Sequence, residues 1–175
     1  MTTVTVKKTT VAELTDANRH VRESAHAVGV ALSSVSVYTE PAVARAVQAE
    51  HNLYARISTE FGMLTSTEAG KRMGSRSSAP RNLATTARRN KALVAVRRGS
   101  YLSYPGFQFG TDGKPLAVIA RLREVAGANG WSEAGLVQWL CSPTTYLDGD
   151  RPVDWLATDP NRVVEVAAEA LAVSW

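Results

Sequence analysis

The chain has 175 residues, of which 45% are hydrophobic and 21% are charged. This composition excludes an intrinsically disordered chain and predicts one ordinary domain or two small ones. No run approaches the roughly 18 consecutive apolar residues of a membrane-spanning helix, and the N-terminus lacks the apolar stretch of a signal peptide. Cys141 is the only cysteine, so no internal disulfide is possible, which favours a reducing cytoplasm.

The positive charge is concentrated in one quarter of the chain. The net charge is +4, yet residues 69–111 carry nine basic side chains and no acidic one. The nine are Lys71, Arg72, Arg76, Arg81, Arg88, Arg89, Lys91, Arg97 and Arg98. A polyanionic partner is the natural interpretation, because each neutralised phosphate releases condensed counterions. The alternative is a solvated basic face without a partner.

The N-terminal third predicts two helices and carries no chemical motif. Apolar residues recur at spacings of three and four from Val11 to about Leu32, which predicts an amphipathic helix. Glu40 and Pro41 open a second helix that runs to about Ile57, with proline in the first turn. We expect residues 1–60 to form an arm or a dimerisation element, so a homodimer is one possible assembly.

Residues 61–110 predict a winged helix-turn-helix. Thr65 and Glu68 form a capping box that starts a short helix ending near Met73. Pro80 fits the first turn of a second helix, Pro80–Asn90. Leu93–Val96 then reads as a strand, Arg97–Ser100 as a tight turn and Tyr101–Tyr104 as the returning strand.

The second of these helices has the composition of a recognition helix. Its inner face is predicted to be Leu83, Ala84 and Ala87. Arg81, Asn82 and Thr85 are expected to reach base edges, since arginine pairs with guanine and asparagine with adenine. Phosphate contacts are assigned to Arg88, Arg89 and Lys91 and, at the first helix, to Lys71, Arg72 and Arg76. Arg97 and Arg98 in the wing are expected either on the DNA backbone or in a minor groove. Residues 69–98 contain no aromatic side chain, which favours duplex DNA over RNA.

The remaining residues, 111–175, predict a helical domain. The predicted helices are Pro115–Ala128, Glu133–Cys141 with Ser132 as its cap, Pro152–Leu156 and Asn161–Ala172. The expected fold class is therefore mainly α, a helical bundle with a central winged helix-turn-helix and one small β-hairpin.

The stretch from Trp139 to Leu156 resembles the toxin-binding domain of the Xre/MbcA/ParS antitoxins. The family pattern falls on Trp139, Pro143, Leu147, Pro152, Asp154 and Leu156. The resemblance implies an antitoxin that neutralises a RES-type toxin, an enzyme that attacks NAD, and represses its own operon. In the family, however, the DNA-binding part is usually a Xre-like bundle early in the chain. A stand-alone DNA-binding regulator of phage or mobile-element origin, without a toxin, is therefore the alternative.

The C-terminal residues assigned to the partner are Trp155, Arg162, Val173 and Trp175. The terminal tryptophan is interpreted as an anchor for the partner, since interfaces favour aromatic residues, with a lid on its own core as the alternative. Taken singly, Trp139, Trp155 and Leu156 also fit a core, and Asp154 fits a helix N-terminus.

No residue pattern predicts catalysis, a metal or a cofactor. His20, His26 and His51 lack further ligands at metal spacing, and no glycine-rich phosphate loop is present. Cys141 follows an apolar helix and is expected to be buried. Asp148 and Asp150 flank Gly149 in a turn that lacks the distal glutamate of a calcium loop. We therefore expect a non-enzymatic protein that is cytoplasmic and associated with the nucleoid. A structural module that binds RNA or an acidic protein is the rival from another class.

Overall fold

A computed structural model describes residues 19–27 and 40–172 of the chain. The chain divides into two compact units, Met1–Arg45 and Ala46–Trp175, and the boundary falls within helix α2 (Pro41–Glu60). In the first unit residues 19–27 are helical, which confirms that part of the predicted helix Val11–Leu32; the rest lies outside the described residues. The predicted start of α2 at Pro41 is confirmed, and the helix extends to Glu60.

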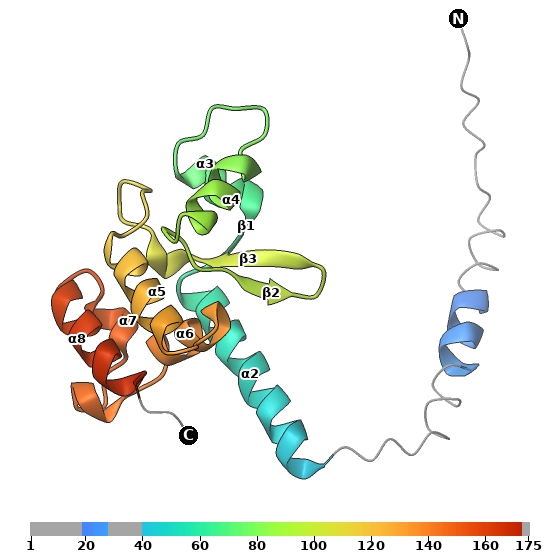
Figure 1. Cartoon of the computed structure of the whole chain (residues 1–175). Helices are drawn as coiled ribbons and strands as arrows, with labels where there is room; N and C mark the ends of the chain where they lie inside the picture. Colours follow the sequence, from blue (N-terminus) through green and yellow to red (C-terminus); the bar gives the residue numbers. More distant parts are fainter. Residues whose placement is uncertain (1–18, 28–39, 173–175) are drawn as a thin grey trace, which may run out of the picture. The chain divides into compact units, whose positions relative to one another are not determined.

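The middle of the second unit contains two short helices and a small sheet (Figure 1). In chain order these are β1 (Met63–Thr65), α3 (Ser66–Arg72), α4 (Arg81–Arg89), β2 (Val96–Arg98) and β3 (Tyr101–Pro105). The sheet is antiparallel in the order β1-β3-β2. Helix, strand, two helices and a hairpin that pairs back onto the first strand make up a winged helix-turn-helix.

The boundaries of the predicted hairpin are wrong in two respects. Leu93, Val94 and Ala95 precede the strand, and the turn consists of Gly99 and Ser100. Arg97 and Arg98 therefore lie on β2, paired with Leu102 and Tyr101 of β3. The third strand, β1, was not predicted.

The predicted helix-turn-helix pair is confirmed, and local chemistry explains its limits. The Thr65 side chain accepts from the Glu68 amide while the Glu68 carboxylate accepts from the Thr65 amide, which completes the capping box. Gly74, beyond the end of α3, has a φ of +83°, a conformation that glycine adopts without strain. Pro80 immediately precedes α4, where its missing amide hydrogen costs no helical hydrogen bond.

The C-terminal helices follow the prediction with shifted ends. They are α5 (Val118–Ala128), α6 (Glu133–Leu140), α7 (Pro152–Trp155) and α8 (Pro160–Ala170), with short 3-10 turns at Gly106–Gln108 and Thr145–Leu147. Helix α5 begins three residues later than predicted because Pro115 instead forms a β-bridge with Phe109. Ser132 caps α6, as predicted.

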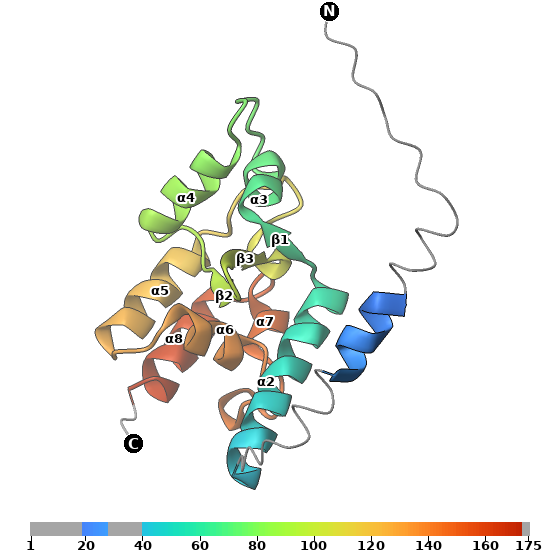
Figure 2. The same cartoon turned by 90° about the vertical axis from the view of Figure 1, so that its right-hand side faces the viewer.

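Two hydrophobic clusters lie on opposite faces of the sheet. Leu64, Leu102 and Tyr104 pack into the cluster that includes Ala69 of α3 and Ala84 of α4. Met63 and Val96 point the other way, into a larger cluster formed with α2 and α5–α8. Figures 1 and 2 show the sheet between the α3–α4 pair and the C-terminal helices. Residues from both 61–110 and 111–175 share this larger cluster, and the expected class, mainly α with a small β element, is confirmed.

The lone cysteine is buried, and its burial raises the pKa of the thiol. Cys141 is 4% exposed, and burial raises the pKa of its thiol to about 12. A raised thiol pKa keeps the group protonated, and only the thiolate attacks disulfide reagents. We therefore expect native protein at about pH 8 to react with a colorimetric disulfide reagent far more slowly than denatured protein does. Equal rates for native and denatured protein would contradict this burial.

Candidate nucleic-acid interface

Helix α4 is held against α3 by very small residues. Ala69 and Ala84 are fully buried where the two helices meet. Gly70 lies so close to Pro80 that a methyl group there would overlap the Pro80 carbonyl. The helices therefore approach each other closely through small residues, while most other side chains of α4 are exposed.

The exposed side of α4 carries polar and cationic side chains. Arg81, Asn82, Thr85, Thr86 and Arg89 are all exposed. Thr86 was not among the predicted contacts, although it lies one turn after Asn82 on the same side. The Thr85 hydroxyl donates to the Arg81 carbonyl at 2.9 Å, which leaves its oxygen free only as an acceptor.

The predicted inner face of α4 requires a correction at Leu83. Ala84 is buried and Ala87 packs partly against the core, but Leu83 is 40% exposed. Leu83 and Ala84 are consecutive and therefore lie about 100° apart around the helix, so the burial of Ala84 turns Leu83 toward the free surface. An apolar side chain therefore accompanies the polar ones on the free surface.

Arg88 was predicted to face outward, but in the structure it joins an internal ion-pair network. Its Nε donates to Glu133 Oε2 at 3.0 Å, and Arg123 Nη2 donates to Glu133 Oε1 at 2.7 Å. The same carboxylate accepts from the Ala95 amide at 2.8 Å. Arg123 Nη1 also donates to the carbonyls of Arg88 and Leu93. The network ties the end of α4 to α5 and α6.

The two wing arginines lie on opposite faces of β2. Arg97 is exposed and belongs to the face that carries Leu102 and the α3–α4 pair. Arg98 points to the other face, where its guanidinium carbon lies 4.8 Å from the centre of the Tyr54 ring. Strand alternation separates them, so the pair predicted to act together at the wing is divided.

Seven of the nine predicted cations remain exposed around the helix-turn-helix and wing. Arg72, one of them, lies over the ring of Phe109 at 5.4 Å. Within residues 40–172 none of the seven forms an ion pair with a carboxylate. The seven are Lys71, Arg72, Arg76, Arg81, Arg89, Lys91 and Arg97.

The predicted partner residues at the C-terminus are only partly within the described chain. Trp155 is half-buried and its indole donates to Asp150 at 3.2 Å. Arg162 is exposed and lies 3.7 Å from Glu165. Val173 and Trp175 fall outside the described residues. Leu156 is buried, in agreement with a core role.

Arg151 organises the region of the predicted antitoxin motif. Its guanidinium donates to both carboxylate oxygens of Glu60, at 2.8 and 2.6 Å, and to Asp154. These hydrogen bonds lower the pKa of Glu60 and raise that of Arg151. Arg151 thus links Asp154, in the first turn of α7, to Glu60 at the end of α2.

Two further observations concern the described residues as a whole. No three His, Cys, Asp or Glu side chains among them are grouped so that they could hold a metal ion. In the same part of the chain, no helix has both the length and the apolar content needed to cross a membrane.

Comparison with known proteins yields one structural likeness. No protein-family model and no curated protein matches the chain. The solved NMR structure of Rv2175c is similar over 64% of this chain and 82% of that one, with a TM-score of 0.55 and 23% identity. This likeness concerns the fold alone.

Proposed function

We propose that the chain binds duplex DNA in a sequence-specific manner, with α4 in the major groove and the wing on the adjacent backbone. The observation that carries the proposal is the set of seven exposed cations in and around α3, α4 and the wing, none of which forms an ion pair within residues 40–172. Phosphate neutralisation by such cations supplies most of the affinity of DNA-binding proteins, and a helix-turn-helix presents its second helix to base edges.

The free side of α4 supplies the chemistry for reading bases. Arg81 can donate twice to a guanine and Asn82 can pair with an adenine. Thr86 and Leu83 add a hydroxyl and an apolar contact of the kind that meets a thymine methyl group. The phosphates are contacted by Arg89, Lys91 and Arg97. Arg88 contributes indirectly, because it fixes the end of the recognition helix to Glu133.

A regulatory role follows from this proposal, because a small protein that occupies a specific duplex site blocks other proteins there. The toxin-neutralising role implied by the antitoxin resemblance stays a prediction, with Trp155 and Arg162 as its contacts within the described chain. Its test is co-purification of the chain with a RES-type toxin. The stand-alone regulator shares the DNA-binding surface and needs no such partner.

Substitutions can distinguish residues that recognise bases from residues that contact phosphates. A preferred site is first selected from a random duplex library. Asn82→Ala should then lose about 1–3 kcal/mol of binding to that site and almost nothing on random DNA. Arg97→Ala should weaken binding to both by a similar factor, since phosphates are the same everywhere. Fluorescence anisotropy with the two duplexes measures both effects.

Two results would count against the proposal. If Asn82→Ala and Arg97→Ala act alike on selected and random DNA, α4 is not the reading element. If single-stranded RNA competes with the selected duplex at equal concentration, the rival RNA-binding function is favoured instead.

A further inference from the structure

A hollow lies between helix α2 and the face of the sheet that is turned away from α3 and α4. Its volume is about 420 Å³, within the range of roughly 300–1,000 Å³ typical of small-molecule sites. Alternation along the strands places Met63, Arg98, Tyr101 and Ser103 on this face. Helix α2 supplies the opposite wall.

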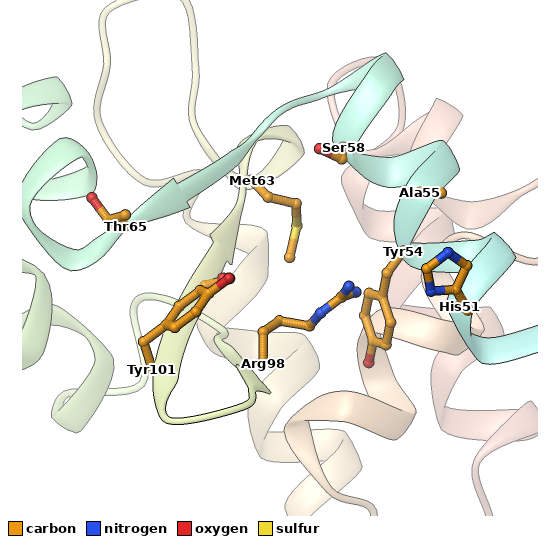
Figure 3. Close-up of a pocket in the computed structure, with 9 residues that line it drawn as sticks. His51, Tyr54, Ala55, Ser58, Met63, Thr65, Arg98 and Tyr101 are labelled. Atoms are coloured by element: carbon orange, nitrogen blue, oxygen red, sulfur yellow. The ribbon is translucent and has the colours of Figure 1, made fainter. Parts of the chain in front are cut away.

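The chemistry of the walls is mixed and centres on one cation. Figure 3 shows the Arg98 guanidinium pointing toward the Tyr54 ring, with Met63 and Tyr101 on the other side of the hollow. In the described chain, the Arg98 side chain has neither an ion pair nor a hydrogen bond, so its stacked guanidinium keeps a free N–H edge. Such an edge matches a carboxylate in two parallel hydrogen bonds.

The other polar groups in the hollow are neutral hydroxyls and one imidazole. Ser103 is 5% exposed, lines the hollow and makes no side-chain hydrogen bond within the described chain. Ser58 and His51 contribute from α2, and Tyr101 on β3 is 60% exposed.

We propose that this hollow binds a small organic anion consisting of a flat apolar ring and a single carboxylate. The carboxylate pairs with the free edge of Arg98 and accepts from Ser103, and the ring packs between Tyr101 and Met63. The planar guanidinium edge of Arg98 matches one carboxylate in a bidentate pair, and the mostly neutral walls supply no second cation among the described residues.

The position of the hollow couples such a ligand to the wing. Arg98 and Tyr101 are cross-strand partners on either side of the Gly99–Ser100 turn. A ligand held by both would fasten the wing to α2 and so change how Arg97 meets DNA. This coupling rests on the proposed function, whereas ligand binding itself does not.

The first experiment follows the isotope-labelled full chain by NMR during titration with benzoate and 2-naphthoate. We expect amide shifts in β2, β3 and the second half of α2, with a Kd of about 1 mM or tighter. Acetate, which lacks the ring, and benzyl alcohol, which lacks the charge, should bind at least about tenfold more weakly. Absence of binding by both aromatic acids, or shifts confined to α4, would overturn the proposal.

Neighbouring arginines provide matched variants. Arg98→Gln keeps a long side chain and should abolish aromatic-acid binding, while Arg97→Gln on the other face of β2 should leave it unchanged. Thermal melts show whether both variants fold. If Arg98→Gln does not fold, Ser103→Ala, which is expected to weaken binding severalfold, supplies an independent test. Unchanged binding in Arg98→Gln, or in Ser103→Ala where that test is needed, overturns the assignment.

The coupling is tested by anisotropy with duplex DNA in the presence and absence of saturating benzoate. The DNA affinity of the native chain should change at least about threefold, and that of Arg98→Gln should not change. Ligand binding with unaltered DNA affinity overturns the coupling. Ligand binding by a chain that binds no DNA at all would instead reject the proposed function and leave the ligand site standing.

Discussion

Replacing Glu133 by alanine should lower the free energy of unfolding by about 3–5 kcal/mol, as expected when one partner of a largely buried ion pair is removed. Arg123 and Glu133 are only 16% and 19% exposed, and they lie 2.7 Å apart. The change would leave Arg123 partly buried without its counter-charge and the Ala95 amide without an acceptor. Denaturant unfolding of the variant and the native chain measures the difference.

Two variants serve as controls for this prediction, one at Glu133 itself and one at a nearby exposed glutamate. Glu133→Gln keeps an acceptor for the Ala95 amide and should lose less stability than Glu133→Ala. Glu124, exposed on α5, should tolerate alanine within about 0.5 kcal/mol. A loss below about 1 kcal/mol for Glu133→Ala would show that the network does not hold the recognition helix.

Gly70→Ala should destabilise the fold by about 3 kcal/mol and reduce DNA binding with it, because added volume at a tight contact forces the backbone apart. The added methyl group would overlap the Pro80 carbonyl at the start of α4. Carbonyl oxygens of the backbone cannot swing aside as a flexible side chain does, so α3 and α4 must separate. A thermal melt and a DNA-binding assay on the same preparation measure both losses.

Gly127→Ala is the matched control for Gly70→Ala. Gly127 lies within α5, and an added Cβ there would meet no described atom within 4 Å beyond its chain neighbours and the adjacent backbone of its own helix. Alanine favours helix over glycine by about 0.5–1 kcal/mol, so this variant should be as stable as the native chain or more so. If Gly70→Ala melts like Gly127→Ala, α3 and α4 are not packed as described.

Local signals account for the parts of the site that were predictable. The capping box at Thr65 and Glu68 and the proline before α4 depend only on residues close in sequence, and both mark helix starts correctly. The run of cations without acids is likewise a property of the sequence alone. These features sufficed to predict the helix pair and its basic character.

What could not be predicted depends on contacts between distant residues. Arg88 and Arg89 are adjacent and identical in the sequence. Only Arg88 pairs with Glu133, 45 residues later, and is thereby removed from the DNA-facing surface. Strand β1 has three residues and exists because β3 pairs with it. The division of Arg97 from Arg98 required the limits of β2, whose start was predicted three residues too early and whose end two residues too early.

The larger hydrophobic cluster shows that the domain limits also depend on contacts between distant residues. Ile57 of α2, Val96 of β2 and Leu122 of α5 all pack into it. Each segment has its own apolar pattern, so the sequence divides readily into pieces. Which pieces share one core is decided by packing between them, and periodicity within a helix carries no information on that.

The salt dependence of duplex binding tests the central claim most directly. Anisotropy with a random-sequence duplex, from about 50 mM to 200 mM salt, should give a slope of about −5 for log K against log salt, corresponding to some six phosphate contacts. Changing Arg81, Arg89 and Arg97 together to glutamine should make the slope shallower by about 3. No binding at the lowest salt, or a slope that the triple variant leaves unchanged, would contradict a DNA interface on α4 and the wing.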